Sequence, residues 1–503
     1  MSDIIYPTLD LFLYDLRNGL GENEEEIQEN RYHFQKKNPA SVWPRLFQRD
    51  TGFEVEYLEL LAKPKNERFV VDGEPYPLEG YYYPVRLGDT YGLLLDCSVN
   101  NLTNPQPAKS FAALREEIET RLQGETASIG QTWMISGILP ASSKASSEDA
   151  TSGDATSGEA SSGDASSGEG TLEKNTACPE VEEIAKACYQ QLMPDSQWEK
   201  ELQGKGQLMG ATIFELSRYE LKLIEDGTTA PTDIQSIQEN RHIIIILYPN
   251  LELAKKAARF YGDWMRLFYY RHKILWSYGQ SRLLKLKLKD YLVTIQGCIK
   301  HIRQSRSKEL DFKKLRETLA SVQETLTPYS IELTYLDFQS RTIDMNSSNY
   351  QKRALLLEQK AGSDSNIAFV EQFSDLVKDK YLLQIAKDYD NLSLGFQLLD
   401  TSINTLRSRV EVDKAVREGA FRNTISVLGL AISANSAVVI HAKSFLFYKK
   451  EERALEHPIG SFLYNRLNVP KESLGGSIVL VLGLGAALIA ASIAQIVIRW
   501  RRE

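Results

Sequence analysis

The sequence predicts an α+β (or α/β) cytosolic domain with a mixed sheet, followed by a long helical stalk and a C-terminal two-helix transmembrane hairpin. Three observations support this fold class. Short alternating or apolar runs, separated by turn residues, fill most of the chain before residue 251. Beyond that point helix breakers become rare and apolar residues fall at heptad spacing. Residues 425–440 and 478–498 are apolar, and the second stretch is long enough to cross a bilayer core of roughly 30 Å.

These patterns divide the 503 residues into five segments. They are an N-terminal α/β part (1–140), a disordered acidic Ser/Gly repeat linker (141–175), a second α/β part (176–250), a helical stalk or coiled coil (251–422), and the transmembrane hairpin (423–500) with an outer loop at 449–474.

The first α/β part shows short strand patterns interrupted by two helical ones. Apolar alternation and turn residues predict strands at 9–16, 53–59, 69–71, 81–87, 90–97 and 132–139. An acidic helix is expected at 23–37 and an amphipathic helix at 111–122.

A pentapeptide repeat of the Ala-Thr-Ser-Gly-Asp type interrupts this pattern at residues 150–170. Its residues cannot build a core and each unit adds a negative charge, so we expect a disordered insertion. Strands resume at 209–216 and 219–224, as a hairpin or an adjacent pair. Four consecutive isoleucines within 242–247 are typical of a central strand buried on both faces. The two α/β parts are therefore expected to share one sheet.

From residue 251 the chain is expected to be helical, with segments at 251–305, 312–326, 329–345 and 350–360 and with Pro328 separating the second from the third. The clearest periodicity follows, in apolar residues whose spacings alternate between four and three. This seam predicts a coiled coil or a tightly packed bundle, and a homo-oligomer. Its members are Ile385, Tyr389, Leu392, Phe396, Leu399, Ile403, Leu406 and Val410.

Residues 478–498 carry no charge, and the stretch at 425–440 continues through Lys443 into an aromatic segment, so both are expected to span a lipid bilayer. The alternative is a pair of buried helices in a soluble core. Basic residues before the first span and after the second, with no signal peptide, predict cytoplasmic N- and C-termini. A small-residue arc on the first span is either a helix-packing face or a pore wall. It consists of Ser426, Gly429, Ser433 and Ser436.

The segment 255–289 contains ten Lys or Arg residues and a single acid, interleaved with aromatic residues. One interpretation is a helix whose aromatic side packs on the sheet while its cations face water. The other is a site for an anionic small molecule or for lipid headgroups. There, phosphate would pair with Arg266, Arg271 and Lys273, and a base would stack on Trp276.

Several function classes are disfavoured. A net charge of −8 argues against a general nucleic-acid binder. The six histidines and four cysteines show no metal-ligand spacing, and no phosphate-binding or hydrolase motif stands in the chain. We therefore expect no metal, no cofactor and no enzymatic activity.

The layout of the chain resembles that of the CorA-like family of two-span cation channels. In order, it consists of a cytosolic α/β domain, long helices, a stalk running into the first span, an outer loop, a second span and a basic tail. The resemblance covers roughly residues 180–503 and rests on layout. The Gly-Met-Asn signature of that family does not follow the first span, since the last methionine is Met345, so no metal-binding residues are carried over. The resemblance implies a homo-oligomeric channel gated by its cytosolic domain. The alternative is a membrane-tethered sensor or effector, of a bacterial stress or defence type, that binds a protein or an anionic small ligand without conducting ions.

Overall fold

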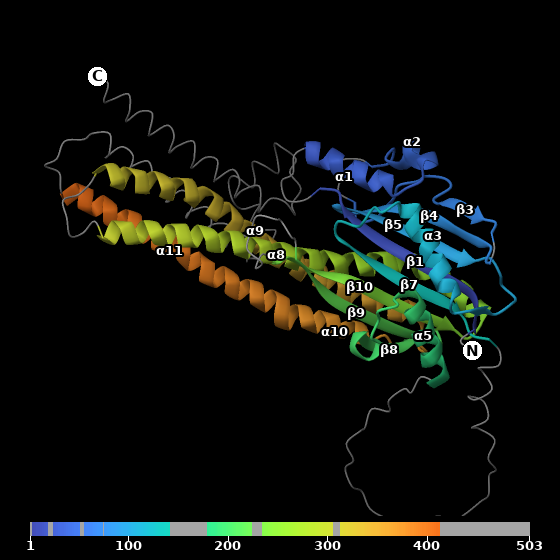
Figure 1. Ribbon diagram of the computed structural model, residues 1–503. Helices are drawn as coiled ribbons and strands as arrows, with labels where there is room; N and C mark the ends of the chain where they lie inside the picture. Colours follow the sequence, from blue (N-terminus) through green and yellow to red (C-terminus); the bar gives the residue numbers. More distant parts are fainter. Residues whose placement is uncertain are drawn as a thin grey trace, which may run out of the picture. The chain divides into compact units, whose positions relative to one another are not determined.

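The computed structural model describes residues 3–18, 24–50, 55–73, 75–140, 179–223, 234–304 and 312–412 (Figure 1). The chain forms two compact units. Unit 1 contains residues 1–280 and 341–383, and unit 2 contains residues 281–340 and 384–503. The division differs from the boundary expected at residue 250, because the helical residues 251–280 belong to the same unit as the sheet.

Unit 1 is built on one ten-stranded mixed sheet, which confirms the predicted α+β class. Its strand order is β2-β4-β5-β1-β7-β10-β9-β8, with β3 on β4 and β6 on β1. The strands are β1 (Asp3–Leu16), β2 (Leu58–Glu59), β3 (Glu67–Val71), β4 (Leu78–Leu87), β5 (Thr90–Val99), β6 (Gln106–Pro107), β7 (Gly130–Ile138), β8 (Leu202–Leu208), β9 (Ala211–Leu223) and β10 (Ile234–Tyr248).

The strands before and after the acidic repeat meet in this sheet. Strand β10 lies parallel to β7 and antiparallel to β9, while β1 pairs antiparallel with both β5 and β7. The four consecutive isoleucines of β10, at residues 243–246, are buried, as expected for a strand covered on both faces.

Two sequence-based boundaries are corrected. The strands expected at 209–216 and 219–224 are one continuous strand, β9, along which β10 pairs on both sides of Arg218. The break in alternation corresponds to a register shift between Glu239 and Arg241 of β10, a bulge and not a turn. Of the strand expected at 53–59, the structure describes residues 55–59, and within these Leu58 and Glu59 pair with β4.

One face of the sheet packs on short helices. Leu9, Leu11 and Leu13 point to this face because side chains alternate along a strand, and they share a core with Phe111 and Leu114 of α3. Figure 1 shows α3 and α5 on this side. The helices that come before β8 are α1 (Glu24–Lys36), the 3₁₀ turn η1 (Ala40–Val42), α2 (Trp43–Leu46), α3 (Ser110–Leu122), α5 (Pro179–Leu192) and α6 (Trp198–Glu201).

The other face carries Asp10, Phe12 and Tyr14 of β1 and is covered by the chain that follows β10. Phe12 packs edge-on against Phe268, and the Tyr14 hydroxyl donates to the main-chain carbonyl of Met265 at 2.8 Å. The covering elements are α7 (Leu251–Ala257), the 3₁₀ turn η3 (Ala258–Phe260) and the unit 1 part of α8 (Tyr261–Gln304). This face therefore buries polar groups together with aromatic ones.

The α9–α10 connection extends the sheet at its β8 edge. Gln207 and Asn366 exchange two main-chain hydrogen bonds, of 2.9 and 2.8 Å. A Cβ on Gly206 would lie 2.1 Å from the Asn366 carbonyl oxygen, so only glycine allows this approach. The helices around this connection are α9 (Phe312–Ala361), α10 (Phe369–Leu376), a π-helical turn η5 (Val377–Leu382) and α11 (Leu383–Val412).

Unit 2 is a bundle of segments from α8, α9 and α11. Tyr329 of α9 donates to the main-chain carbonyl of Leu392 on α11, and Gly395 lies against both Leu292 and Tyr329. The buried carboxylate of Asp388 on α11 is held by Arg282 at 2.6 Å and Lys285 at 2.7 Å, both on α8. Burial alone would raise the pKa of Asp388, but hydrogen bonds from Lys285 and Arg282 hold it below its usual range.

The helices expected at 312–326, 329–345 and 350–360 are in fact one helix, α9, with Pro328 inside it. Proline in a helix interior removes a hydrogen bond and costs about 3 kcal/mol. Leu326 and Tyr329 on either side of it are buried, and Leu333 lies buried one turn further on. Packing on both sides of the proline therefore offsets the local cost.

The N-terminal half of the stalk seam packs within one chain. Ile385 and Leu392 are buried, and Tyr389 and Phe396 are half-buried. The remaining seam positions lie on α11, but their side chains are outside the described part of the structure. They are Leu399, Ile403, Leu406 and Val410.

No helix within the described ranges combines the length and the apolar character needed to cross a bilayer. The two predicted spans, the outer loop at 449–474 and the small-residue arc lie outside those ranges. That arc comprises Ser426, Gly429, Ser433 and Ser436.

Candidate functional site

Polar side chains form two adjacent rows on the sheet face that α7 and α8 cover. Register places Arg68, Tyr81, Asp96 and Asp10 directly opposite one another across β3, β4, β5 and β1. Directly opposed residues share a face with Cβ atoms roughly 5 Å apart, so this is a continuous row. The neighbouring row, two residues along each strand, contains Glu79, Ser98, Thr8 and Ser136.

A bulge in β1 completes the second row. Register shifts between Ile5 and Thr8, and Tyr6 adopts a left-handed backbone conformation with φ of 50°. The bulge directs the Tyr6 hydroxyl to Glu79, to which it donates at 2.9 Å, and the hydroxyls of Thr8 and Ser98 lie 2.9 Å apart. Bulges re-aim side chains in this way.

Asp10 and Asp96 form a buried carboxyl pair at the centre of the first row. Asp10 is fully buried, and its Oδ2 accepts a hydrogen bond from the Tyr261 hydroxyl at 2.6 Å. Within the described residues, no N–H or hydroxyl group donates to Asp10 Oδ1. Asp96 lies directly opposite Asp10 on β5, and each of the two carboxyl groups shifts the pKa of the other.

Burial sets the protonation of this pair. It raises the pKa of Asp10 to about 7, against smaller lowering effects of the hydrogen bonds from Tyr261 and Asp96. Burial, and then the charge of Asp10, raise the pKa of Asp96 well above its usual range. Near neutral pH the two groups therefore share one proton, and the pair can both donate and accept.

A cavity of about 490 Å³ opens above Asp96, and we refer to it as the Asp96 pocket. This volume falls within the range of small-molecule sites, about 300–1,000 Å³. Its floor and walls come from the two rows and from the turns that lead into α8. They include Tyr6, Thr8, Arg68, Phe69, Val70, Glu79, Tyr81, Asp96, Ser98, Ser136, Tyr248, Leu251, Ala254, Lys255, Ala258 and Tyr261.

Local sequence explains the helical wall. Asn250 caps α7 by accepting a hydrogen bond from the Leu253 amide at 3.0 Å. The short helix and the 3₁₀ turn place Tyr261 at the first position of α8, next to Asp10. One side of the pocket is thus the start of the longest helix in contact with the sheet face.

A second polar cluster lies further along α8 and is enclosed. The Thr132 hydroxyl lies 2.7 Å from both His242 Nδ1 and His272 Nε2, and His242 Nε2 lies 3.1 Å from Glu215. Burial, then the charges of His242 and Arg271, lower the pKa of His272 well below its usual range. Burial would raise the pKa of Glu215, but its neighbours Arg271 and His242 hold it below normal. All five side chains are buried, which is typical of a structural network.

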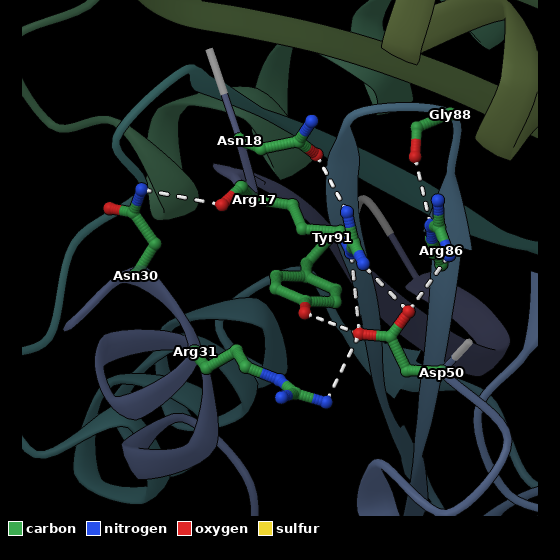
Figure 2. Close-up of polar contacts among 8 residues, drawn as sticks. All are labelled: Arg17, Asn18, Asn30, Arg31, Asp50, Arg86, Gly88 and Tyr91. Carbon is green, nitrogen blue, oxygen red and sulfur yellow. Dashed lines mark hydrogen bonds and ion pairs between the residues drawn. The ribbon is translucent and has the colours of Figure 1, made fainter. Parts of the chain in front are cut away.

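A third cluster surrounds Asp50, whose side chain is fully buried (Figure 2). Its carboxylate accepts hydrogen bonds from Arg17, Arg31 and Arg86 at 2.9–3.5 Å and from the Tyr91 hydroxyl at 2.6 Å. The carboxylate occupies the point where the three guanidinium groups converge. The cluster therefore ties the segment after α2 to helix α1, to the end of β1 and to strands β4 and β5.

The proposed anion-binding residues are held by partners inside unit 1. Arg271 is buried, with its guanidinium 3.4 Å from Glu215 and stacked 4.1 Å from the Phe373 ring centroid. Lys273 is buried, pairs with Asp89 at 2.6 Å and lies over the half-buried Trp276.

The third cation, Arg266, lies over the Tyr57 ring and donates to the Gly262 carbonyl. Because Arg271 and Lys273 are buried, the basic side of this helix does not face water at these two positions, whereas the packing interpretation expected it to. The anion-binding role stays a prediction, and geometry favours packing for these residues.

Sequence reasoning missed Asp10, Asp96 and Tyr261. The pair joins strands 86 positions apart, which no local motif records. One indication was present, since Asp96 follows three leucines in a strand that is buried throughout. An acid at such a position costs free energy unless it is paired or neutral.

No match to this chain was found among protein-family models, curated proteins or solved structures.

Proposed function

We propose that this protein is a ligand sensor held in a membrane by its C-terminal hairpin, with the Asp96 pocket as the sensing site. The observation that carries the proposal is a pair of buried carboxyl groups, Asp10 and Asp96, that lie directly opposite each other on β1 and β5, with Asp96 lining a cavity of about 490 Å³. Burying such a pair costs free energy, which a purely structural position does not require.

The pocket is connected to the rest of the chain through α8. Tyr261 both lines the pocket and donates to Asp10, and it is the first residue of α8. Residues 281–304 of the same helix belong to unit 2. A ligand that alters the Tyr261–Asp10 hydrogen bond therefore acts on a helix that both units share.

A ligand screen tests the sensing function. The full chain is purified in detergent and its melting temperature is measured against a library of small polar compounds. We expect at least one compound to raise the melting temperature of the wild type and not that of Asp96→Asn. Glu119→Gln, an exposed acid on α3, serves as the control and is expected to respond like the wild type. If no compound shifts the wild type, or if every shift persists in Asp96→Asn, the pocket is not the sensing site.

The membrane part of the proposal rests on the apolar stretches 425–440 and 478–498. It assigns the N- and C-termini to the cytoplasm and 449–474 to the outside. A cysteine at Ser461 is expected to react with an impermeant maleimide in intact cells, and one at Glu503 is not. Labelling at Glu503 alone would reverse the orientation.

For the output of the sensor, the resemblance to CorA-like channels favours ion conduction by a homo-oligomer. Proteoliposomes containing the full chain are expected to release a trapped cation dye, and a pocket ligand is expected to change the rate. Ligand binding without flux would instead make the protein a tethered sensor or effector whose hairpin is an anchor.

A further inference from the structure

We infer that the Asp96 pocket selects zwitterions, compounds with a protonated amine and a separate anionic group, with the amine at the floor and the anion at the mouth. The inference rests on the sensing function proposed above and adds the chemical class of the ligand. It follows from how charge is distributed with depth in the pocket.

The floor is acidic. Asp96 lies there with Asp10 directly opposite it on the neighbouring strand, and Glu79 lies in the adjacent row. The two cations that line the pocket, Arg68 and Lys255, are both exposed, which places them at the mouth. A ligand that matches both levels is positive at one end and negative at the other.

Hydrogen-bonding capacity at the floor favours a donor. Within the described residues, no N–H or hydroxyl group donates to the Asp96 carboxyl, and Glu79 receives a single donor, the Tyr6 hydroxyl. Carboxylates accept several hydrogen bonds each, and those from an ammonium group are short and charge-assisted. An anion placed at this depth would meet the charges of Glu79 and of the acid pair.

Aromatic rings complete the match to a cation. Phe69, Tyr81, Tyr248 and Tyr261 line the same pocket. Ring faces attract ammonium groups electrostatically, and this attraction grows when the cation is desolvated.

Binding of an ammonium group beside Asp96 favours the ionised form of the acid pair, so the shared proton leaves to solvent while the ligand amine stays protonated. The groups that face Asp96 include acids, phenols and two cations, and Arg68 acts in the same direction by lowering its pKa. They are Asp10 and Tyr6 on β1, Glu79 and Tyr81 on β4, Arg68 on β3, Tyr248 on β10, Lys255 on α7 and Tyr261 on α8.

The experiment is titration calorimetry of the full chain in detergent with ω-amino acids from glycine to 6-aminohexanoate, and with butylamine and butyrate as single-charge probes. We expect one ω-amino acid to bind best, butylamine to bind more weakly and butyrate not to bind. Repeating the titration in buffers of different ionisation enthalpy is expected to show proton release.

Two variants test which residues contact the ammonium end and the anionic end of the ligand. Asp96→Asn is expected to weaken the best ω-amino acid at least about tenfold, the effect of losing a charged hydrogen bond. The second variant combines Arg68→Gln with Lys255→Gln, both at exposed positions where folding is not at risk. It is expected to reduce the affinity for the ω-amino acid to that for butylamine, and to leave the affinity for butylamine unchanged.

Butyrate binding as tightly as the amino acids, or an amino-acid affinity that Asp96→Asn does not change, would overturn the inference. If none of these probes binds while a screened compound of another class stabilises the wild type through Asp96, the zwitterion inference fails and the sensing function stands. If the screen also finds nothing, both fail.

Discussion

Replacing Asp10 by Asn should change how the stability of unit 1 depends on pH. The amide keeps the hydrogen bond from Tyr261, which its oxygen accepts, but it has no proton to lose. In the wild type burial raises the Asp10 pKa to about 7, whereas an unfolded Asp titrates near pH 3.9. Between these values the native state holds a proton that the unfolded state has lost. The raised pKa therefore lowers the free energy of unfolding: the loss is absent below about pH 4, grows as pH rises, and is complete above about pH 7.

The magnitude follows from linkage. One extra proton on the native state lowers the free energy of unfolding by about 1.4 kcal/mol per pH unit. From pH 5 to pH 7 the free energy of unfolding of the wild type should therefore fall by about 3 kcal/mol more than that of Asp10→Asn. For a unit of this size that corresponds to roughly 6 °C in melting temperature.

The assay is scanning calorimetry of the full chain at pH 5, 6, 7 and 8 for the wild type, Asp10→Asn and the exposed-acid control Glu119→Gln. The control should run parallel to the wild type, and Asp10→Asn should gain stability relative to both as pH rises. Parallel curves for Asp10→Asn and the wild type would refute the shared-proton interpretation of the pair.

Three further predictions concern other parts of the chain. Gly206→Ala should destabilise unit 1 by about 2 kcal/mol, measured by thermal unfolding, because the new Cβ would lie 2.1 Å from the Asn366 carbonyl oxygen. The control Gly73→Ala should be neutral, since no atom lies within 4 Å of its Cβ, and equal effects of the two substitutions would disprove the edge contact. Phe396→Asp should lower the melting temperature by placing a charge at a half-buried seam position, and a lower oligomer mass in detergent would show that the seam also joins copies. Deleting 150–169 should leave the melting temperature nearly unchanged, and a large loss of folded protein would contradict its description as a linker.

Local patterns were enough to predict most of the sheet. Alternation along β1 separates Leu9, Leu11 and Leu13 from Asp10 and Phe12, and the structure places these sets on opposite faces. Strands with a clear period and well-marked turns were found because backbone geometry fixes which side chains share a face. The apolar run of β10 was recognised as a central strand for the same reason.

Local breaks in pattern were less informative. The interruption near Arg218 was interpreted as a turn although it lies opposite a bulge, and Pro328 was interpreted as a helix end although α9 continues through it. In both cases the packed neighbours determine whether the element continues. For β9 the neighbour is β10, and for α9 the neighbours are α8 and α11. Tertiary packing overrides a local preference of about 3 kcal/mol when buried side chains flank it.

The candidate site was the least predictable feature because its geometry depends on register. Asp10 and Asp96 carry no common motif, and their contact exists only because β1 and β5 pair with these residues opposite each other. The basic segment left two interpretations open, a helix packed on the sheet or an anion site. Its charge count could not show that Arg271 and Lys273 lie opposite Glu215 and Asp89, because these acids come from β9 and from the β4–β5 turn.

The polar contacts of α8 suggest why acids persist on this buried sheet face. Along residues 261–273 the helix is held by three contacts, from Tyr261 to Asp10, from Arg271 to Glu215 and from Lys273 to Asp89. Hydrogen bonds and ion pairs have directions and discrete partners, unlike an apolar interface, which tolerates gradual sliding. Of these three contacts, only the first borders the Asp96 pocket. A change in the protonation of Asp10 therefore alters the first of these contacts of α8 and leaves the other two in place.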